Sequence, residues 1–195
     1  STDNRHMHES TLSFRTGDLA WAMLALANMY HATGDTAYLD AAEAMGEWIA
    51  ANCERTGSGI NAGYSGGWAW DGDTQLWEAI VAFTEDNTVL MKAFEKLSRL
   101  TEKDKWRNRA DHAEGFLTAM WDADAGRFYT GVNPDGAISN VDVLDVQSCG
   151  PMAFADSPYW TALDWSADHL IYPDSPETPA DWRQFDFNAD LDGVW

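Results

Sequence analysis

The sequence repeats the stretch Thr33-Gly34-Asp35-Thr36-Ala37-Tyr38-Leu39-Asp40-Ala41-Ala42-Glu43 as Thr101-Glu102-Lys103-Asp104-Lys105-Trp106-Arg107-Asn108-Arg109-Ala110-Asp111, at an offset of 68 residues. In each copy a short polar turn precedes a run whose apolar residues recur at helical spacing. The same offset places Thr16-Gly17-Asp18 over Thr84-Glu85-Asp86. The repeat therefore predicts a recurring helical hairpin, made of an inner helix, a tight turn and an outer helix.

The apolar periodicity predicts helices where the repeat requires them. Thr16 or Asp18 is expected to cap the first helix, and the Gly34-Asp35 turn to end it. A shorter and weaker third copy begins at Leu144. The expected helices cover residues 19–30, 36–53, 84–100 and 102–121, with a fifth beginning near residue 145 and a sixth over residues 158–172.

These hairpins predict an all-α fold class, with one short β-hairpin-like insertion near residues 126–138. The whole chain, residues 1–195, is expected to form a single domain of this kind. Three hairpins bury only one of their faces, which leaves an apolar surface to be covered. We therefore expect an incomplete domain, either a fragment or a chain that self-associates or pairs with a second chain.

The charge balance excludes some classes of partner. The sequence has 12 Lys and Arg against 32 Asp and Glu, a formal net charge of −20. Such a field repels phosphate groups, so we expect neither nucleic acid nor membrane as a partner. Neutral sugars remain compatible with it. The 11 Trp exceed what a core needs, because an indole N–H requires a partner, so some should line a surface or cleft.

The sequence lacks the motifs of common metal and cofactor sites. Cys53 and Cys149 lack the spacing of a redox or zinc site and are expected to be free thiols. The histidines of the helices have no carboxylate or Cys at ligand spacing, and no phosphate-binding glycine loop is present. No stretch approaches the roughly 18 apolar residues of a transmembrane helix, and there is no basic, apolar leader. We expect no metal and no cofactor.

Several short motifs together resemble those of a known superfamily. They are Gly66-Gly67-Trp68, Thr84-Glu85-Asp86-Asn87, Trp106-x-x-Arg109-Ala110, Met120-Trp121-Asp122 followed by Gly126-Arg127-Phe128-Tyr129-Thr130-Gly131, and Leu144-Asp145-Val146-Gln147. In this combination the chain resembles bacterial members of the six-hairpin glycosidase superfamily, the (α/α)6 toroids. The resemblance covers most of residues 16–155 and extends to the tail at 186–195.

The resemblance implies that the chain forms about half of a six-hairpin barrel. It leaves the substrate open, because the superfamily includes glucanases, unsaturated-uronyl hydrolases, phosphorylases and sugar epimerases. The resemblance alone favours an extracytoplasmic or secreted location, because members of this family are commonly found there.

In such toroids the ligand lies over the N-termini of the inner helices, and this chain has acids at each expected start: Asp18, the pair Glu85 and Asp86, and Asp145. Glycoside hydrolysis needs two carboxyl groups, one protonated and one ionised. Capping and the helix dipole also favour acids there, which is the preferred explanation for Asp18. Two adjacent acids exceed one cap, so Glu85 or Asp86 is expected to act opposite Asp145. The resemblance implies an inverting reaction more than a retaining one.

The glycine-rich stretch over residues 57–73 is predicted to be a long functional loop. Tyr64, Trp68 and Trp70 are expected to stack on pyranose rings, unless they fill the core beneath the loop. Hydrogen bonds to sugar hydroxyls are expected from Asp71, Asn87 and Gln147. A calcium site at Asp71-x-Asp73 is unlikely to form because the other spaced ligands are missing. The remaining helix-face tryptophans, Trp21, Trp48, Trp106, Trp121 and Trp160, are expected in the core.

The leading hypothesis is a glycoside hydrolase-like domain that acts on a polysaccharide or oligosaccharide by general acid–base catalysis. One alternative is a carbohydrate-binding or structural helical domain without turnover, and another is a sugar epimerase or lyase on the same fold. Two carboxylates facing one cleft would favour the hydrolase. A tryptophan platform without such a pair would favour the binder, and an imidazole in the cleft would favour the epimerase.

Overall fold

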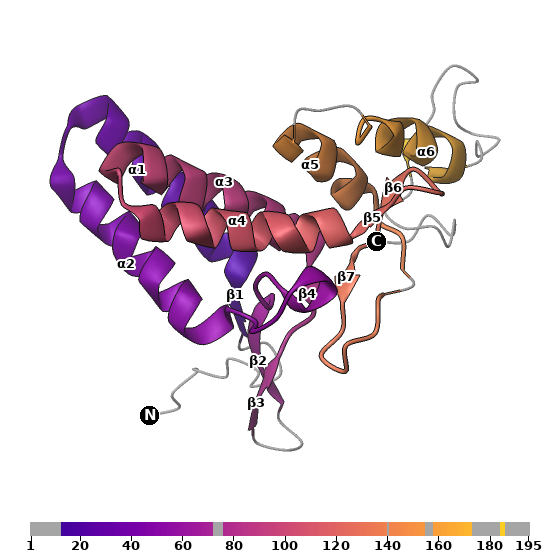
Figure 1. The fold of residues 1–195 in the computed structure, drawn as a ribbon, viewed down its shortest axis with the longest axis horizontal. Helices are drawn as coiled ribbons and strands as arrows, with labels where there is room; N and C mark the ends of the chain where they lie inside the picture. Colours follow the sequence, from indigo (N-terminus) through magenta and orange to yellow (C-terminus); the bar gives the residue numbers. More distant parts are fainter. Residues whose placement is uncertain (1–12, 72–75, 140, 155–157, 173–183, 186–195) are drawn as a thin grey trace, which may run out of the picture.

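The computed structural model describes residues 13–71, 76–139, 141–154, 158–172 and 184–185. Asp73 and the tail at residues 186–195 lie outside this range. Six α-helices form three consecutive hairpins (Figure 1): α1 (Thr16–Thr33) with α2 (Thr36–Cys53), α3 (Thr84–Thr101) with α4 (Asp104–Ala119), and α5 (Leu144–Phe154) with α6 (Thr161–His169). The predicted helical hairpins are therefore confirmed.

The 68-residue offset of the sequence repeat is also the offset of the structural repeat. Helices α1 and α3 are each 18 residues long, and α2 and α4 begin at equivalent positions. Both inner helices end in a left-handed residue, Gly34 with φ 74° and Glu102 with φ 56°. The backbone N–H of each donates to the carbonyl four residues earlier, on Tyr30 and Ser98 respectively. The two copies thus share the geometry of their tight turn.

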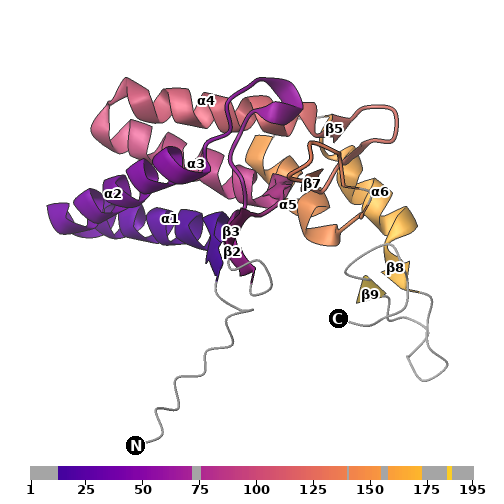
Figure 2. The ribbon, with the colours of Figure 1, turned by 90° about the horizontal axis from the view of Figure 1, so that it is seen from below.

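Short antiparallel strands gather near the starts of the inner helices (Figures 1 and 2). Strands β1 (Ser13–Arg15), β2 (Gly67–Asp71) and β3 (Leu76–Ala79) form one sheet in that order. The expectation that residues 57–73 form only a loop is therefore wrong for its second half. There Trp68 and Trp70 recur with the period of two that a strand requires. The first half contains a short 3-10 helix, η2 (Gly59–Asn61).

The remaining strands form three two-stranded ladders. Strand β4 (Ala82–Phe83) pairs with β7 (Gly131–Val132), and β5 (Trp121–Asp122) pairs with β6 (Arg127–Phe128). The insertion predicted near residues 126–138 thus contributes to two separate ladders. Strand β8 (Ile171–Tyr172) pairs with β9 (Gln184–Phe185). The predicted sixth helix is therefore too long at both ends.

Threonine hydroxyls, not acidic caps, hold the starts of the inner helices. Thr16 donates its hydroxyl to the carbonyl of Ser65 (2.8 Å), and Thr84 donates to that of Tyr129 (2.6 Å). Neither helix has a side-chain cap, so the capping role expected for Thr16 or Asp18 is wrong. Each hydroxyl instead binds its inner helix to the segment that follows the outer helix of the same hairpin. This arrangement leaves the acids of the first turn free for other contacts.

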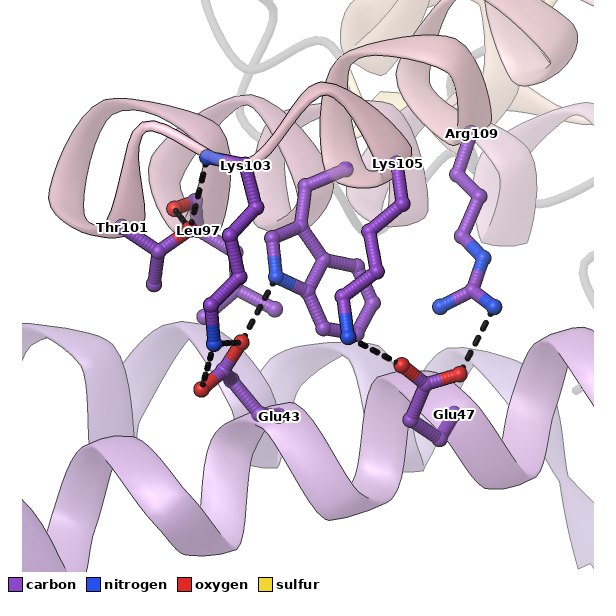
Figure 3. A network of polar contacts seen from close by, with 8 residues as sticks. Glu43, Glu47, Leu97, Thr101, Lys103, Lys105 and Arg109 are labelled. Atoms are coloured by element: carbon purple, nitrogen blue, oxygen red, sulfur yellow. Dashed lines mark hydrogen bonds and ion pairs between the residues drawn. The ribbon is translucent and has the colours of Figure 1, made fainter.

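Ion pairs join the outer helices α2 and α4 around a buried indole (Figure 3). Glu43 accepts hydrogen bonds from Lys103 (2.6 Å) and from the Trp106 indole N–H (2.9 Å). Glu47 accepts one from Arg109 (2.7 Å) and pairs with Lys105. Trp106 is fully buried, as expected, and stacks on Phe94 of α3 at 5.8 Å. The first two hairpins are therefore locked together by both polar and apolar contacts.

The first and third hairpins expose large apolar side chains, whereas the second does not. Trp21 on α1 is 57% exposed, Met152 on α5 is 65% exposed, and Trp160 beside α6 is 45% exposed. Between Leu19 and Tyr30, α1 carries no charged residue, although neighbouring helices cover only part of it. The core position expected for Trp21, Trp48 and Trp160 is wrong, because each of the three side chains is 40% or more exposed. Trp121 is half-buried in β5.

No helix in the described ranges has the length and apolar character needed to cross a membrane. Cys53 is buried and Cys149 is half-buried, and both are free thiols, as expected. Burial raises the pKa of both thiols, which keeps them protonated at neutral pH.

Candidate active site

Two of the three inner helices, α3 and α5, place their first-turn acids around one cavity. Glu85 and Asp86 of α3 and Asp145 of α5 line a cavity of about 380 Å³, together with Arg15 of β1. This volume lies within the roughly 300–1,000 Å³ typical of small-molecule sites. Asp18 of α1 is exposed and does not line the cavity, although its negative charge acts on Asp86.

Glu85 carries the largest change in acidity in this cavity. The pKa of its carboxyl is raised to about 7, first by burial and then by the charge of Asp145, a hydrogen bond with Asp145 and the charge of Asp86. Arg15 opposes these effects only in part. At neutral pH, Glu85 is therefore partly protonated, and its carboxyl is hydrogen-bonded to that of Asp145.

Asp86 lies deeper than Glu85, between the starts of two helices. Burial raises the pKa of Asp86 to about 6, against the opposing charge of Arg15. The backbone N–H of Gly17, in the first turn of α1, donates to this carboxylate. Its second oxygen, Oδ2, is buried without a hydrogen-bond partner among the described residues. Asp86 is thus an oriented carboxylate with one buried oxygen that has no hydrogen-bond partner among the described residues.

A glycine of α1 makes room for the Asp86 carboxylate. A Cβ at Gly17 would lie 2.2 Å from Asp86 Oδ1, far inside van der Waals contact, and one at Gly66 would lie 3.2 Å from Oδ2. Both positions therefore favour the residue without a side chain. Sequence reasoning missed Gly17 and Arg15 as parts of the site. The signal available was their position directly beside Thr16 and Asp18.

The contact between Glu85 and Asp145 does not fit the expected inverting pair. Inverting enzymes hold their two carboxyl groups roughly 6.5–9.5 Å apart, with a water between them. Two carboxyl groups joined by a hydrogen bond leave no space for that water. The catalytic roles expected for Glu85, Asp86 and Asp145 stay predictions. Glu85 and Asp145 form one hydrogen-bonded pair, and Asp86 is the separate carboxylate.

Three residues expected to bind sugar are instead buried parts of the framework: Tyr64, Asn87 and Gln147 are each 0% exposed. The Asn87 amide pairs with the backbone of Tyr64, accepting from its N–H (2.8 Å) and donating to its carbonyl (2.9 Å). Gln147 does the same with Phe128, at 2.8 Å in both directions. Each amide thus clamps an extended segment to an inner helix, and neither is free to bind a ligand.

The strand register places the aromatic side chains of β2, which were predicted to bind sugar, on the face of the sheet that points away from the acids. Phe14 of β1 pairs with Trp68 of β2, and Arg15 pairs with Gly67. Because neighbouring residues of a strand point to opposite faces, Trp68 and Trp70 share the face of Phe14, and Asp71 lies on the other. Trp68, Trp70 and Asp71 do not line the acidic cavity. The structure therefore does not bring them together with Glu85.

No histidine lines this cavity among the described residues. The Nε2 atom of His112 lies 3.0 Å from the Arg55 carbonyl and 3.2 Å from that of Gly63, in a structural contact. His169 lies against Trp165 on α6. The described ranges also contain no group of three or more acids, His or Cys with the geometry of a metal site.

No family model and no curated protein sequence matches this chain. Solved structures do match its fold. The family 76 glycoside hydrolase (mannosidase) Bt3792 of Bacteroides thetaiotaomicron VPI-5482 is 12% identical with a TM-score of 0.60, over 90% of this chain and 49% of that one. The family 76 α-mannanase BT2949 of the same species is 15% identical with a TM-score of 0.59, over 89% and 48%.

A sugar epimerase from a ruminal bacterium matches at 16% identity and a TM-score of 0.56, over 80% of this chain and 44% of that one. The chain thus spans about half the length of these proteins. At such identities the likeness shows the fold alone. The chain has the fold of about half of an (α/α)6 toroid.

Proposed function

We propose that this chain carries the acid–base residues of a glycoside hydrolase acting on an oligosaccharide or polysaccharide. One observation carries the proposal: Glu85, with a pKa raised to about 7, is hydrogen-bonded to Asp145 in a cavity at the starts of the inner helices. A carboxyl group that stays protonated near neutral pH is what the departure of a sugar oxygen requires.

Glu85 is the general acid in this proposal. As the bond between the anomeric carbon and the glycosidic oxygen breaks, the Glu85 proton passes to that oxygen. Water then supplies the hydroxyl of the new reducing end, and the proton that water loses restores the Glu85 carboxyl. Asp145 is a positioning residue that holds the proton on Glu85 until substrate arrives. Asp86, with a pKa of about 6, is mostly ionised at neutral pH, so its negative charge stabilises positive charge on the sugar ring.

The acidic surroundings and the structural neighbours narrow the substrates to test first. A net charge of −20 disfavours anionic uronic-acid polymers and leaves neutral glycans. A mannosidase and an α-mannanase are among the proteins of the same fold, so α-mannans come first in a panel.

A sugar epimerase or isomerase is the second candidate function. It is favoured by the fold of the ruminal epimerase and of a D-mannose isomerase, which is 19% identical over 93% of this chain. The absence of a described histidine from the acidic cavity weighs against it. The products distinguish the two, because hydrolysis creates new reducing ends and epimerisation does not.

The test is incubation of the full chain with neutral polysaccharides and oligosaccharides, with reducing ends and sugar identity measured. Glu85→Gln is expected to lower the rate by about a hundredfold or more, because the amide cannot donate the proton that the leaving oxygen needs. Glu114→Gln, on the exposed side of α4, is the matched control and should leave the rate unchanged. No release of sugar by wild type, or equal rates in both variants, would reject the proposal.

A further inference from the structure

A second hollow lies on the other side of strand β1 from the acidic cavity. It has a volume of about 240 Å³ and is lined by Phe14, Trp48, Asn52 and Trp68. The two hollows share no lining residue. Phe14 lines one and its neighbour Arg15 lines the other, as the alternation of side chains along a strand requires.

The aromatic side chains of this hollow are held in place from two elements. Phe14 of β1 lies beside Trp48 of α2 with ring centroids 6.1 Å apart. The Trp68 indole donates to the carbonyl of Asn52 (3.0 Å), and the Asn52 amide donates to the carbonyl of Trp48 (2.7 Å). These bonds fix Trp68 against the last turn of α2. The surface is therefore ordered before any ligand arrives.

These rings remain accessible to solvent despite their ordering. Phe14 is 51% exposed and Trp48 is 40% exposed, although α2 has a buried face that could have taken an indole. Ordered aromatic rings clustered at a surface hollow are typical of ligand-binding sites.

The lining chemistry fits a neutral sugar. The hollow combines aromatic faces with one amide and no charged side chain. A pyranose ring presents an apolar C–H face, which an aromatic ring covers, and hydroxyls at its edge, which an amide can bind. The overall charge of −20 opposes anionic polymers. A linear apolar ligand would leave the Asn52 amide unused.

We propose that Phe14, Trp48 and Trp68 form a surface site that binds a pyranose unit of a neutral polysaccharide, outside the acidic cavity. The ligand class rests on the carbohydrate substrate of the proposed function, although the site needs none of its chemistry. A polymer bound here stays close to the acidic cavity, which raises its effective concentration there. A short oligosaccharide that can occupy only one hollow has no increase in effective concentration from the other.

The test is binding of soluble α-mannan, measured by isothermal titration calorimetry in a Glu85→Gln background, where hydrolysis does not interfere. Trp48→Ala is expected to weaken binding of the polymer about tenfold or more. Trp48→Phe keeps an aromatic ring and should retain most of the affinity for the polymer. Trp160→Ala removes an equally exposed indole from the third hairpin and should change nothing. Circular dichroism verifies that each variant is folded.

The outcomes separate this site from the proposed function. Equal affinity of wild type and Trp48→Ala, or equal losses in Trp48→Ala and Trp160→Ala, would overturn the surface site even if wild type hydrolyses the polymer. Loss of binding in Trp48→Ala alone would support the site even if wild type releases no sugar. When both proposals hold, Trp48→Ala hydrolyses short oligosaccharides at the wild-type rate and polymer more slowly.

Discussion

The carboxyl of Glu85, in the first turn of α3, is hydrogen-bonded to that of Asp145, in the first turn of α5. This hydrogen bond joins two hairpins of the toroid. The hydroxyls of Thr16 and Thr84 donate to backbone carbonyls of adjacent segments, and the acids beside these threonines do not cap the helices. The repeated hairpins that form the fold therefore also place Glu85 and Asp145 around the acidic cavity.

The pH dependence of kcat/KM for hydrolysis should reflect the raised pKa of Glu85. Because the pKa of Glu85 is raised to about 7, the fraction able to donate a proton falls as pH rises, so kcat/KM should decline above about pH 7. Asp86, with a pKa near 6, must be ionised, so the rate should also decline below about pH 6. Removing the Asp145 charge lowers the pKa of Glu85, so Asp145→Asn should move the alkaline decline to lower pH. An unchanged alkaline limb in Asp145→Asn would contradict the coupling.

Gly17 should be required for activity and not for folding. The methyl group of Gly17→Ala would displace the Asp86 carboxylate, and a displacement of about 1 Å costs on the order of a hundredfold in rate. Gly115→Ala on α4 is the matched control, because a Cβ there meets nothing within 4 Å. It should stabilise the fold by about 0.5–1 kcal/mol and leave the rate unchanged. Rates and urea unfolding of both variants test this, and a fully active Gly17→Ala would contradict it.

The tight turn of the second hairpin should tolerate glycine better than glutamate. Glu102 has a φ of 56°, a left-handed conformation that costs a non-glycine residue roughly 1 kcal/mol. Glu102→Gly should therefore raise the free energy of unfolding by about 0.5 kcal/mol after the entropy of glycine is counted. The equivalent Gly34→Ala should lower it by about 1 kcal/mol. Urea unfolding measures both changes, and a destabilised Glu102→Gly would show that its side chain outweighs the strain.

Much of the fold was readable from local sequence. The stretches at residues 33–43 and 101–111 each carry a turn and a helical period, and neither depends on distant residues. The helix at residues 36–53 has the predicted boundaries, and α3 begins at the predicted Thr84. Asp145 was likewise expected at the start of an inner helix, and it is there.

The parts that escaped prediction depend on contacts between distant segments. The pairing of Phe14 with Trp68 decides which face the aromatics occupy, and no local pattern specifies it. Asn87 and Gln147 were expected to bind ligand because they follow acids, but their amides meet backbone far along the chain. Exposure of Trp21 was missed for a different reason: an apolar helix is normally covered, and no described element covers this side of α1.

That uncovered side leads to a prediction about assembly. Trp21 of α1 and Met152 of α5 line one apolar groove, and both are more than half exposed. Two copies of a half-toroid would supply six hairpins, so we expect the chain to self-associate through this groove. Trp21→Gln combined with Met152→Gln should give a monomer by sedimentation velocity, and Trp48→Gln on the outer surface should not. A monomeric wild type would instead assign the groove to further hairpins of a longer polypeptide.

The most direct test of the central claim is a double-mutant cycle of Glu85→Gln and Asp145→Asn, with kcat/KM measured on a glycan from the substrate panel. If the two carboxyl groups act through one shared proton, the double variant should lose no more than the worse single variant, about a hundredfold or more. Losses that multiply would show that Glu85 and Asp145 act independently and would contradict the proton-sharing pair. Wild-type rates in Glu85→Gln would remove Glu85 from the chemistry.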